Sequence, residues 1–111
     1  MFELLFGNQN TERIFFYLLK NETCYGRELS LRFDSAIFAF QNTLQKLERA
    51  NVLVSFMKGH TRFYQFNPQY PFLSELKSFL EKAYAFLPKD IQEKYYNMTN
   101  RKRPRRTGKP L

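Results

Sequence analysis

The chain has 111 residues, 43% of them hydrophobic and 18% aromatic, which suggests a single domain with a substantial core and excludes disorder of the whole chain. Its formal net charge of +8 favours a polyanionic partner, although the total alone does not place that partner on the folded part. No apolar run approaches the roughly 20 residues of a membrane span, so we expect a soluble cytoplasmic protein that does not contact a membrane.

Two apolar segments begin the chain. Residues 1–7 (MFELLFG) predict a helical turn that packs on the domain or on a second copy. In the next helix, for which Asn10 and Thr11 offer N-caps, apolar residues recur at helical spacing. Phe16 and Tyr17 widen this apolar face, and a face this wide often contacts more than one neighbour, within the fold or across a dimer.

Two further helices, separated by a short turn, follow. Residues 26–33 (GRELSLRF) predict the first of them. Residues 34–53 predict the second, which begins with Asp34 or Ser35 as N-cap and ends at Asn51, a residue type that tolerates the left-handed conformation of many helix ends. Two helices joined in this way form a helix-turn-helix outline, which many all-helical domains also contain.

The helix predicted over residues 34–53 has two different faces. A period of 3.6 residues gathers four apolar side chains on a stripe that we expect to be buried: Ile37, Phe40, Leu44 and Leu47. The opposite side is rich in amides and ends in a basic residue, and it consists of Ser35, Phe38, Asn42, Gln45 and Arg49, flanked by Gln41 and Lys46. This division predicts a recognition helix, and the alternative is an ordinary amphipathic core helix.

A β-hairpin is predicted next, because the apolar period changes from 3.6 to 2. Residues 52–58 (VLVSFMK) and 62–66 (RFYQF) predict its strands, with a turn between them. Three side chains cluster at its tip: Lys58, His60 and Arg62. A recognition-type helix followed at once by a basic-tipped hairpin is a winged helix-turn-helix arrangement, and the alternative is a structural hairpin with solvated charges.

A long amphipathic helix is predicted over residues 72–87, with Pro71 at its start and Pro88 after its end. We expect it to pair with the first long helix and with its counterpart in a second subunit, and packing wholly within one chain is the alternative. The expected dimer interface consists of Leu4, Leu5, Phe15, Phe72, Leu76, Phe79, Leu80, Ala83 and Leu87. Residues 90–97 predict another turn or two of helix.

The C-terminal residues are basic and interrupted by proline. Six basic residues and no acidic ones follow residue 100: Arg101, Lys102, Arg103, Arg105, Arg106 and Lys109. The predicted organisation is therefore a winged helix-turn-helix domain over residues 1–97, with dimerisation helices at both ends, and a basic disordered tail over residues 98–111. The tail allows three interpretations, namely a minor-groove arm, a non-specific phosphate tether or a disordered end, and we favour the tether.

Four segments carry a family resemblance: LFGNQNTERIFFYLL, YGRELSLRF, LQKLERANVL and RFYQFNPQYPFLSEL. With them the chain resembles the ArsR-like winged helix-turn-helix transcriptional regulators of bacteria and archaea, over residues 5–87. The resemblance implies a homodimer that binds double-stranded DNA, with each recognition helix in a major groove and each hairpin near the flanking phosphates or minor groove. It implies base-reading positions at Ala36, Ile37, Phe38, Gln41 and Asn42.

The residues and the resemblance agree in part. Periodicity independently selects Phe38 and Asn42, whereas it places Ile37 inward, and there we follow periodicity. Asn51 stands where the family usually has Gly after the recognition helix, and Ala36 stands where it usually has Ser or Thr at the start. The paired cysteines of the metal-sensing branch have no equivalent, which indicates a regulator that does not sense metal.

These observations assign candidate contacts. Amide side chains bond adenine in two places and apolar ones contact the thymine methyl group, so the expected base-reading residues are Ser35, Phe38, Gln41 and Asn42. Phosphate contacts fix position without choosing a sequence, and we expect them from Arg27, Arg32, Gln45, Lys46 and Arg49, together with the hairpin tip.

The leading hypothesis is a dimeric, sequence-specific DNA-binding regulator, which we expect to be a repressor. The alternative is a winged-helix module or adaptor that binds a protein, for example an enzyme encoded nearby; RNA binding is third, because the aromatic residues look buried. We expect no enzyme, cofactor or metal site, because the sequence has no phosphate-cradling Gly-rich loop and no nucleophile set around its single Cys and single His.

Overall fold

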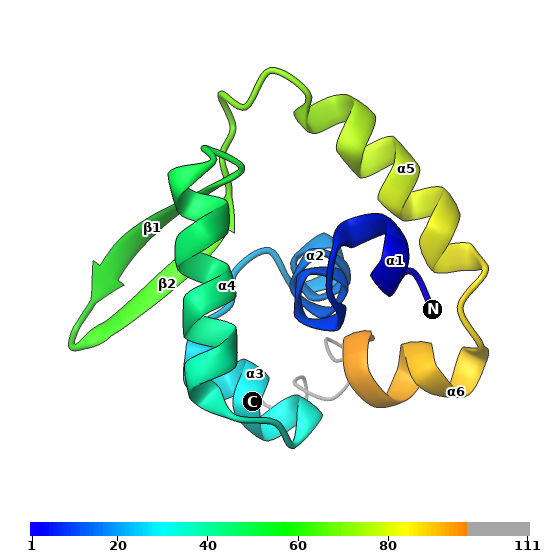
Figure 1. Cartoon of the computed structure of the whole chain (residues 1–111), viewed down its shortest axis with the longest axis horizontal. Helices are drawn as coiled ribbons and strands as arrows, with labels where there is room; N and C mark the ends of the chain where they lie inside the picture. Colours follow the sequence, from blue (N-terminus) through cyan, green and yellow to red (C-terminus); the bar gives the residue numbers. More distant parts are fainter. Residues whose placement is uncertain (98–111) are drawn as a thin grey trace, which may run out of the picture.

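The computed structural model, which describes residues 1–97, is mainly helical with a small antiparallel hairpin (Figure 1). The elements are α1 (Glu3–Phe6), α2 (Gln9–Asn21), α3 (Gly26–Phe33), α4 (Ile37–Arg49), β1 (Leu53–Lys58), β2 (Thr61–Phe66), α5 (Leu73–Ala85), α6 (Lys89–Ile91) and the π-helical turn η1 (Gln92–Tyr96). The predicted class, mainly α with a small β-hairpin, is confirmed. The basic tail predicted over residues 98–111 lies outside the described residues.

Helix α2 forms the centre of the fold, and α1, α4, α5 and η1 pack around it (Figure 1). Ile14 and Phe16 are completely buried, and Tyr17 and Leu18 almost so. A helix that is apolar on most of its circumference has to be covered on all sides, which explains why the chain wraps around this one. The expected N-caps Asn10 and Thr11 are wrong, because the helix begins earlier: Asn8 Oδ1 accepts the Thr11 backbone N–H at 2.7 Å.

The turn between α3 and α4 is held by side chains rather than by a helix cap. Asp34 ends α3 in the left-handed conformation, with φ 52° and ψ 50°. The Ser30 hydroxyl donates to the Ser35 carbonyl, and Arg13 Nη1 donates to the Ser35 hydroxyl at 3.1 Å. Neither Asp34 nor Ser35 caps α4, whose N-cap is Ala36 without a side-chain hydrogen bond. The predicted cap is therefore wrong, because both residues belong to the turn.

The hairpin is connected to α4 by Asn51, whose φ of 67° confirms its predicted left-handed conformation. Strands β1 and β2 pair from Leu53 opposite Phe66 to Lys58 opposite Thr61. Within the two-residue turn, the first residue is a glycine with φ 64° and the second has a negative φ, the pattern of a type II′ turn. This turn matches the right-handed twist of the strands, so the hairpin closes tightly.

A single residue adds a third position to this small sheet. The Cys24 backbone N–H donates to the Tyr64 carbonyl at 3.0 Å, and the Tyr64 N–H donates to the Cys24 carbonyl at 2.8 Å. The segment between α2 and α3 thereby pairs with β2 on the side away from β1. This pairing anchors the hairpin to the helical part, and the sequence pattern did not predict it.

The C-terminal elements close the domain against α2 and α3. Helix α5 packs on α2, as predicted. After Pro88, α6 and η1 turn back, and the Tyr95 ring stacks on Phe33 with ring centroids 5.1 Å apart. Asn21 Nδ2 donates to the Tyr96 carbonyl at 2.9 Å, and the Tyr96 side chain is buried. The predicted additional turns of helix are therefore part of the core.

Within residues 1–97, no helix has both the length and the apolar character that a membrane crossing needs.

Candidate nucleic-acid interface

Helix α4 separates its side chains into a covered face and an open face. Phe40 and Leu44 are completely buried against the core, whereas Gln41 and Asn42 are exposed and the Phe38 side chain is 69% exposed. Gln45, Lys46 and Arg49 continue the open face toward the end of the helix and are also exposed. The two faces predicted from helical periodicity are present in the structure, although Leu47 of the expected buried stripe is only half-buried.

Two residues at the start of α4 differ from the prediction. Ile37 was expected on the buried stripe, but its side chain is 37% exposed, because this first residue of α4 lies beside Gly26, which has no side chain to cover it. Ser35 was expected on the open face, but it is half-buried in the preceding turn, where Arg13 Nη1 donates to its hydroxyl. Ser35 is therefore not available as a base-reading residue.

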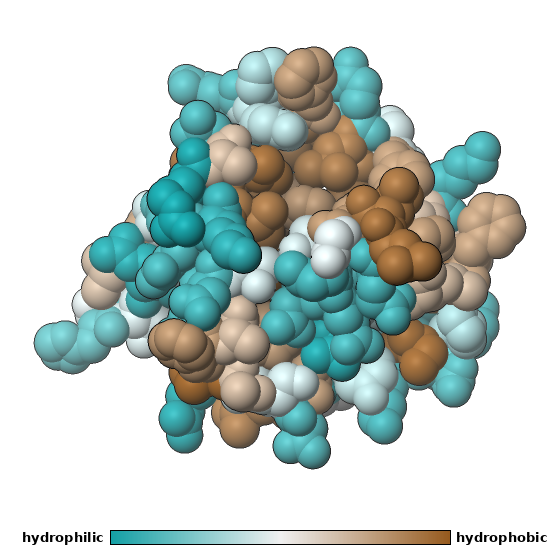
Figure 2. Space-filling model, viewed as in Figure 1, coloured by the Kyte–Doolittle hydropathy of each residue, from teal (hydrophilic) through white to brown (hydrophobic). Residues whose placement is uncertain are grey.

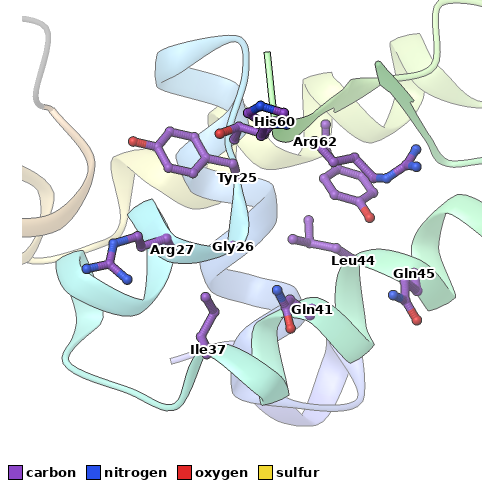
Figure 3. A pocket seen from close by; sticks show the side chains of 11 residues that line it. Tyr25, Gly26, Arg27, Ile37, Gln41, Leu44, Gln45, His60 and Arg62 are labelled. Atoms are coloured by element: carbon purple, nitrogen blue, oxygen red, sulfur yellow. The ribbon is translucent and has the colours of Figure 1, made fainter. Parts of the chain in front are cut away.

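A hollow of about 360 Å³ lies between the start of α3, the open face of α4 and the hairpin tip (Figure 3). Five of the predicted site residues line it, and they come from four parts of the fold: Arg27 from α3, Gln41 and Gln45 from α4, His60 from the hairpin turn and Arg62 from β2. The fold thus brings together side chains separated by up to 35 positions in the sequence. The hollow combines cationic donors with amides that both donate and accept hydrogen bonds.

Gly26 allows α3 and α4 to approach each other at this hollow. A Cβ atom on this glycine would lie 3.1 Å from Gln41 Cγ, closer than side chains normally pack. The position of the Gln41 amide therefore depends on the absence of a side chain at residue 26. Gly26 was not predicted as part of the site, because a glycine at the start of a helix does not by itself indicate which element packs against it.

The hairpin tip carries cations next to aromatic rings. Phe56 and Phe63 stack with their centroids 5.7 Å apart, and Lys58 Nζ lies 5.9 Å from the centroid of the Phe63 ring. The Arg62 guanidinium donates to the Ser55 hydroxyl at 2.9 Å. Lys58, His60 and Arg62 are all exposed, so the three predicted tip residues project from one end of the hairpin.

Arg32 differs from the other predicted phosphate contacts. It is half-buried, and its Nη1 donates to the Lys94 carbonyl at 3.3 Å, which ties α3 to the C-terminal turn. It lies outside the hollow that Arg27 lines. The structure therefore gives Arg32 a role within the fold, whereas the side chains of Arg27, Lys46 and Arg49 are exposed.

Within residues 1–97, positive charge is concentrated on the side of the molecule formed by residues 26–66. This segment has six basic and three acidic residues, whereas residues 1–25 and 67–97 together have six basic and seven acidic ones. Two of the three acids, Glu28 and Glu48, are half-buried and hydrogen-bonded. The Glu48 carboxylate accepts a hydrogen bond from the Ser55 hydroxyl, and the Glu28 carboxylate accepts one from the Tyr17 hydroxyl. The pKa of Tyr17 is raised by burial and also by its hydrogen bond with Glu28. In Figure 2, hydrophilic residues cover the part of α4 next to the hairpin, whereas apolar residues lie at the start of the helix.

Apolar side chains gather on the opposite side of the molecule, over α1 and α5 (Figure 2). Four of the residues predicted for a dimer interface are exposed there: Leu4, Leu5, Phe72 and Phe79. Leu76 is half-buried, and the other four are buried in the core of the described chain: Phe15, Leu80, Ala83 and Leu87. An apolar groove of about 540 Å³ runs along this side, lined by Met1, Phe2, Phe79, Lys82, Ala83 and Phe86.

The part of the chain that the structure describes has no group of three or more His, Cys, Asp or Glu side chains that could hold a metal ion. Cys24 is completely buried, and burial raises the pKa of its thiol, which keeps it protonated and unreactive. Comparisons of the chain with protein-family models, curated proteins and solved structures found no significant match.

Proposed function

We propose that the chain is a sequence-specific, double-stranded DNA-binding regulator of transcription, a repressor that acts as a homodimer through a winged helix-turn-helix domain. The observation that carries the proposal is the open face of α4, whose exposed amides adjoin the basic hairpin tip around one hollow. The sequence resemblance to ArsR-like regulators supports the same function.

The order of the elements supports a winged helix-turn-helix domain. Helices α3 and α4 are joined by a short turn, and β1 and β2 follow α4 directly. The Cys24 backbone pairs with Tyr64, so the segment before α3 joins the hairpin as a third strand position. A hairpin fixed in this way lies beside the open face of α4, where it reaches a duplex that α4 enters.

The exposed side chains of α4 suit the edges of bases. Gln41 and Asn42 each carry an amide that forms two hydrogen bonds with adenine, and the exposed Phe38 ring matches the methyl group of thymine. Each good base contact contributes about 1–3 kcal/mol of discrimination against the wrong base. We therefore assign sequence reading to Phe38, Gln41 and Asn42.

The basic side chains around this face suit the phosphate backbone. Arg27 lies at the start of α3, Lys46 and Arg49 at the end of α4, and Lys58 and Arg62 near the hairpin tip. All five are exposed, so they reach phosphates without first leaving a buried position. Each neutralised phosphate contributes about 0.9 to the slope of log affinity against log salt concentration.

The apolar side of the molecule supports the homodimer. Leu4 is fully exposed, and the exposed fractions of Leu5, Phe72 and Phe86 are between 62% and 69%. Apolar patches of this kind, rimmed by polar residues, mark contacts with other proteins. A twofold contact over α1 and α5 would leave the open face of α4 uncovered in both subunits.

The proposal is tested by selection of binding sites from random duplexes with the full chain, followed by footprinting. We expect a palindromic site, because a twofold dimer presents two identical helices. Asn42→Ala should lose base preference, whereas the matched hairpin variant Lys58→Ala should weaken binding to all duplexes alike. Equal binding of every duplex by the parent and both variants would contradict the assignment of sequence reading to α4.

One observation favours a second function, a winged-helix adaptor that binds a protein. Three apolar side chains are exposed near the turn between α3 and α4: Leu31 at 71%, Ile37 at 37% and Phe38 at 69%. An apolar group at this end of the recognition helix also suits a protein surface. Recovery of one stoichiometric protein partner, together with duplex binding that disappears when residues 98–111 alone are deleted, would favour the adaptor.

A further inference from the structure

A chain of hydrogen bonds joins α4 to both strands of the hairpin. The Ser55 hydroxyl on β1 donates to Oε2 of Glu48, in the last turn of α4, at 2.6 Å. The same hydroxyl accepts a hydrogen bond from Nη1 of Arg62 on β2 at 2.9 Å. Glu48 and Ser55 are half-buried, whereas Arg62 is exposed. One serine therefore connects a carboxylate at the end of the helix with a guanidinium near the hairpin tip.

The direction of these hydrogen bonds follows from the chemistry of the three groups. A carboxylate only accepts and a guanidinium only donates, whereas a hydroxyl has one hydrogen to donate and lone pairs to accept. The Ser55 hydroxyl therefore bridges Glu48 and Arg62 by acting as a donor to the first and an acceptor from the second. Each bond has one charged partner, and such bonds are shorter and roughly twice as strong as neutral ones.

The bridge gives Arg62 a preferred direction before any ligand binds. Arg62 lines the hollow together with Arg27 and His60 (Figure 3). A guanidinium has five N–H donors, and the bond with Ser55 leaves the others for a second partner. An unrestrained surface arginine loses much rotamer freedom when it binds a ligand. A restrained arginine has already lost part of this freedom, so the entropic cost of binding is smaller.

We propose that Ser55 is a positioning residue for duplex binding, which holds the Arg62 guanidinium toward the hollow, where it meets a backbone phosphate. This inference rests on the proposed function, because the phosphate belongs to the duplex. The proposal adds Ser55 to the site and, through its hydrogen bond with Ser55, Glu48. Neither residue would be selected as a direct contact with a base or a phosphate.

Affinity for a duplex of fixed sequence, measured over a range of salt concentrations, tests the proposal. Arg62→Ala should lower the salt slope by about 0.9, the contribution of one phosphate. Ser55→Ala should weaken binding about fivefold, and Ser55→Thr, which keeps the hydroxyl, should restore parental affinity. The double variant Ser55→Ala/Arg62→Ala should bind no more weakly than Arg62→Ala alone, because Ser55 acts through Arg62. Additive losses would overturn the proposal.

A second measurement needs no DNA. The order parameter of the Arg62 Nε–Hε bond in the free protein, measured by NMR relaxation, should fall in Ser55→Ala and stay parental in Ser55→Thr. An Arg62 side chain that is equally ordered in all three proteins would overturn the positioning role. The order of Arg62 could fall in Ser55→Ala while the parent protein binds no duplex. In that case the proposed function fails, and a phosphate is no longer the partner of Arg62. The positioning of Arg62 by Ser55 would still stand.

Discussion

The two sides of this molecule rest on the same core and present opposite surfaces. On the side of α4 and the hairpin, a completely buried stripe that includes Phe40 and Leu44 lies under exposed amides and cations. On the side of α1 and α5, Leu80 is buried, but other apolar side chains such as Leu4 and Phe86 are exposed. The first surface is stable in water and offers directed hydrogen bonds, whereas the second leaves apolar area unburied.

Under the proposed function, this difference corresponds to two kinds of partner. Amides and guanidinium groups gain binding free energy only when the acceptors and donors of a ligand lie at fixed positions, as they do in the groove of a duplex. Apolar side chains gain free energy from burial against any surface that removes them from water. A second copy of the chain supplies such a surface, because a twofold contact places the same patch on both sides. The proposal therefore assigns recognition to one side of the chain and assembly to the other.

The largest expected effect separates the buried and exposed parts of the apolar side. Leu80 is completely buried, so Leu80→Ala should lower the free energy of unfolding by about 2–5 kcal/mol. Leu4 is fully exposed, and Leu4→Ala should change it by less than about 0.5 kcal/mol in the monomer. Urea unfolding at low protein concentration measures both. Equal losses would show that α1 contributes to the core as α5 does.

The next effect concerns self-association. Leu4→Glu combined with Leu5→Glu places two charges on the exposed apolar side and should weaken dimerisation by at least about 30-fold, as loss of an interface hot spot does. The matched control is Phe38→Glu, which places a charge on the exposed face of α4 and should leave the dimer intact. Sedimentation velocity distinguishes the two results. A dimer that survives the α1 changes and dissociates with Phe38→Glu would reverse the assignment of the two sides.

A smaller effect is expected at the connection between α4 and the hairpin. Asn51 has φ 67°, where a residue with a Cβ atom and no compensating side chain is disfavoured by roughly 1–2 kcal/mol. Asn51→Ala should therefore destabilise the protein by about 1 kcal/mol, whereas Asn51→Gly should be neutral or slightly stabilising. Chemical unfolding of the two variants checks this difference. Equal stability would indicate that the residue does not need the left-handed conformation.

The mildest effect lies in the shared core and depends on pH. Burial raises the pKa of Tyr96 above the ordinary value of 10.0, so its hydroxyl stays protonated in the folded chain. In the unfolded chain the hydroxyl ionises near pH 10.0, and the folded state therefore loses stability as pH rises above that value. Unfolding measured below and above this pH should show a shallower loss for Tyr96→Phe than for the parent. A variant with the same slope would contradict the buried position of Tyr96.

Local sequence signals predicted the elements of the site well. The bounds of α3 agree with the predicted residues 26–33, and both the two faces of α4 and the left-handed Asn51 follow from periodicity and conformational preference. These features depend on neighbours within a few positions, and so the sequence contains the information directly. The hairpin was predicted for the same reason, since its two strands are adjacent in the chain.

Long-range contacts were not predicted. The pairing of Cys24 with Tyr64 joins residues 40 positions apart and has no repeating pattern. Ser35 lies in the turn before α4, where Arg13 donates a hydrogen bond to its hydroxyl, and not on the expected base-reading face. Tyr96 is buried, although its neighbours in the sequence are polar. Each of these depends on how separate elements meet, which propensity and period do not encode.

The central claim is that the open face of α4 and the hairpin tip together bind a DNA duplex. An NMR titration of the full chain with a selected duplex tests it most directly, by following every backbone amide. We expect the largest shifts in α4 and in residues 58–62, with little change along α5. Shifts confined to α1 and α5, or to residues 98–111, would contradict it.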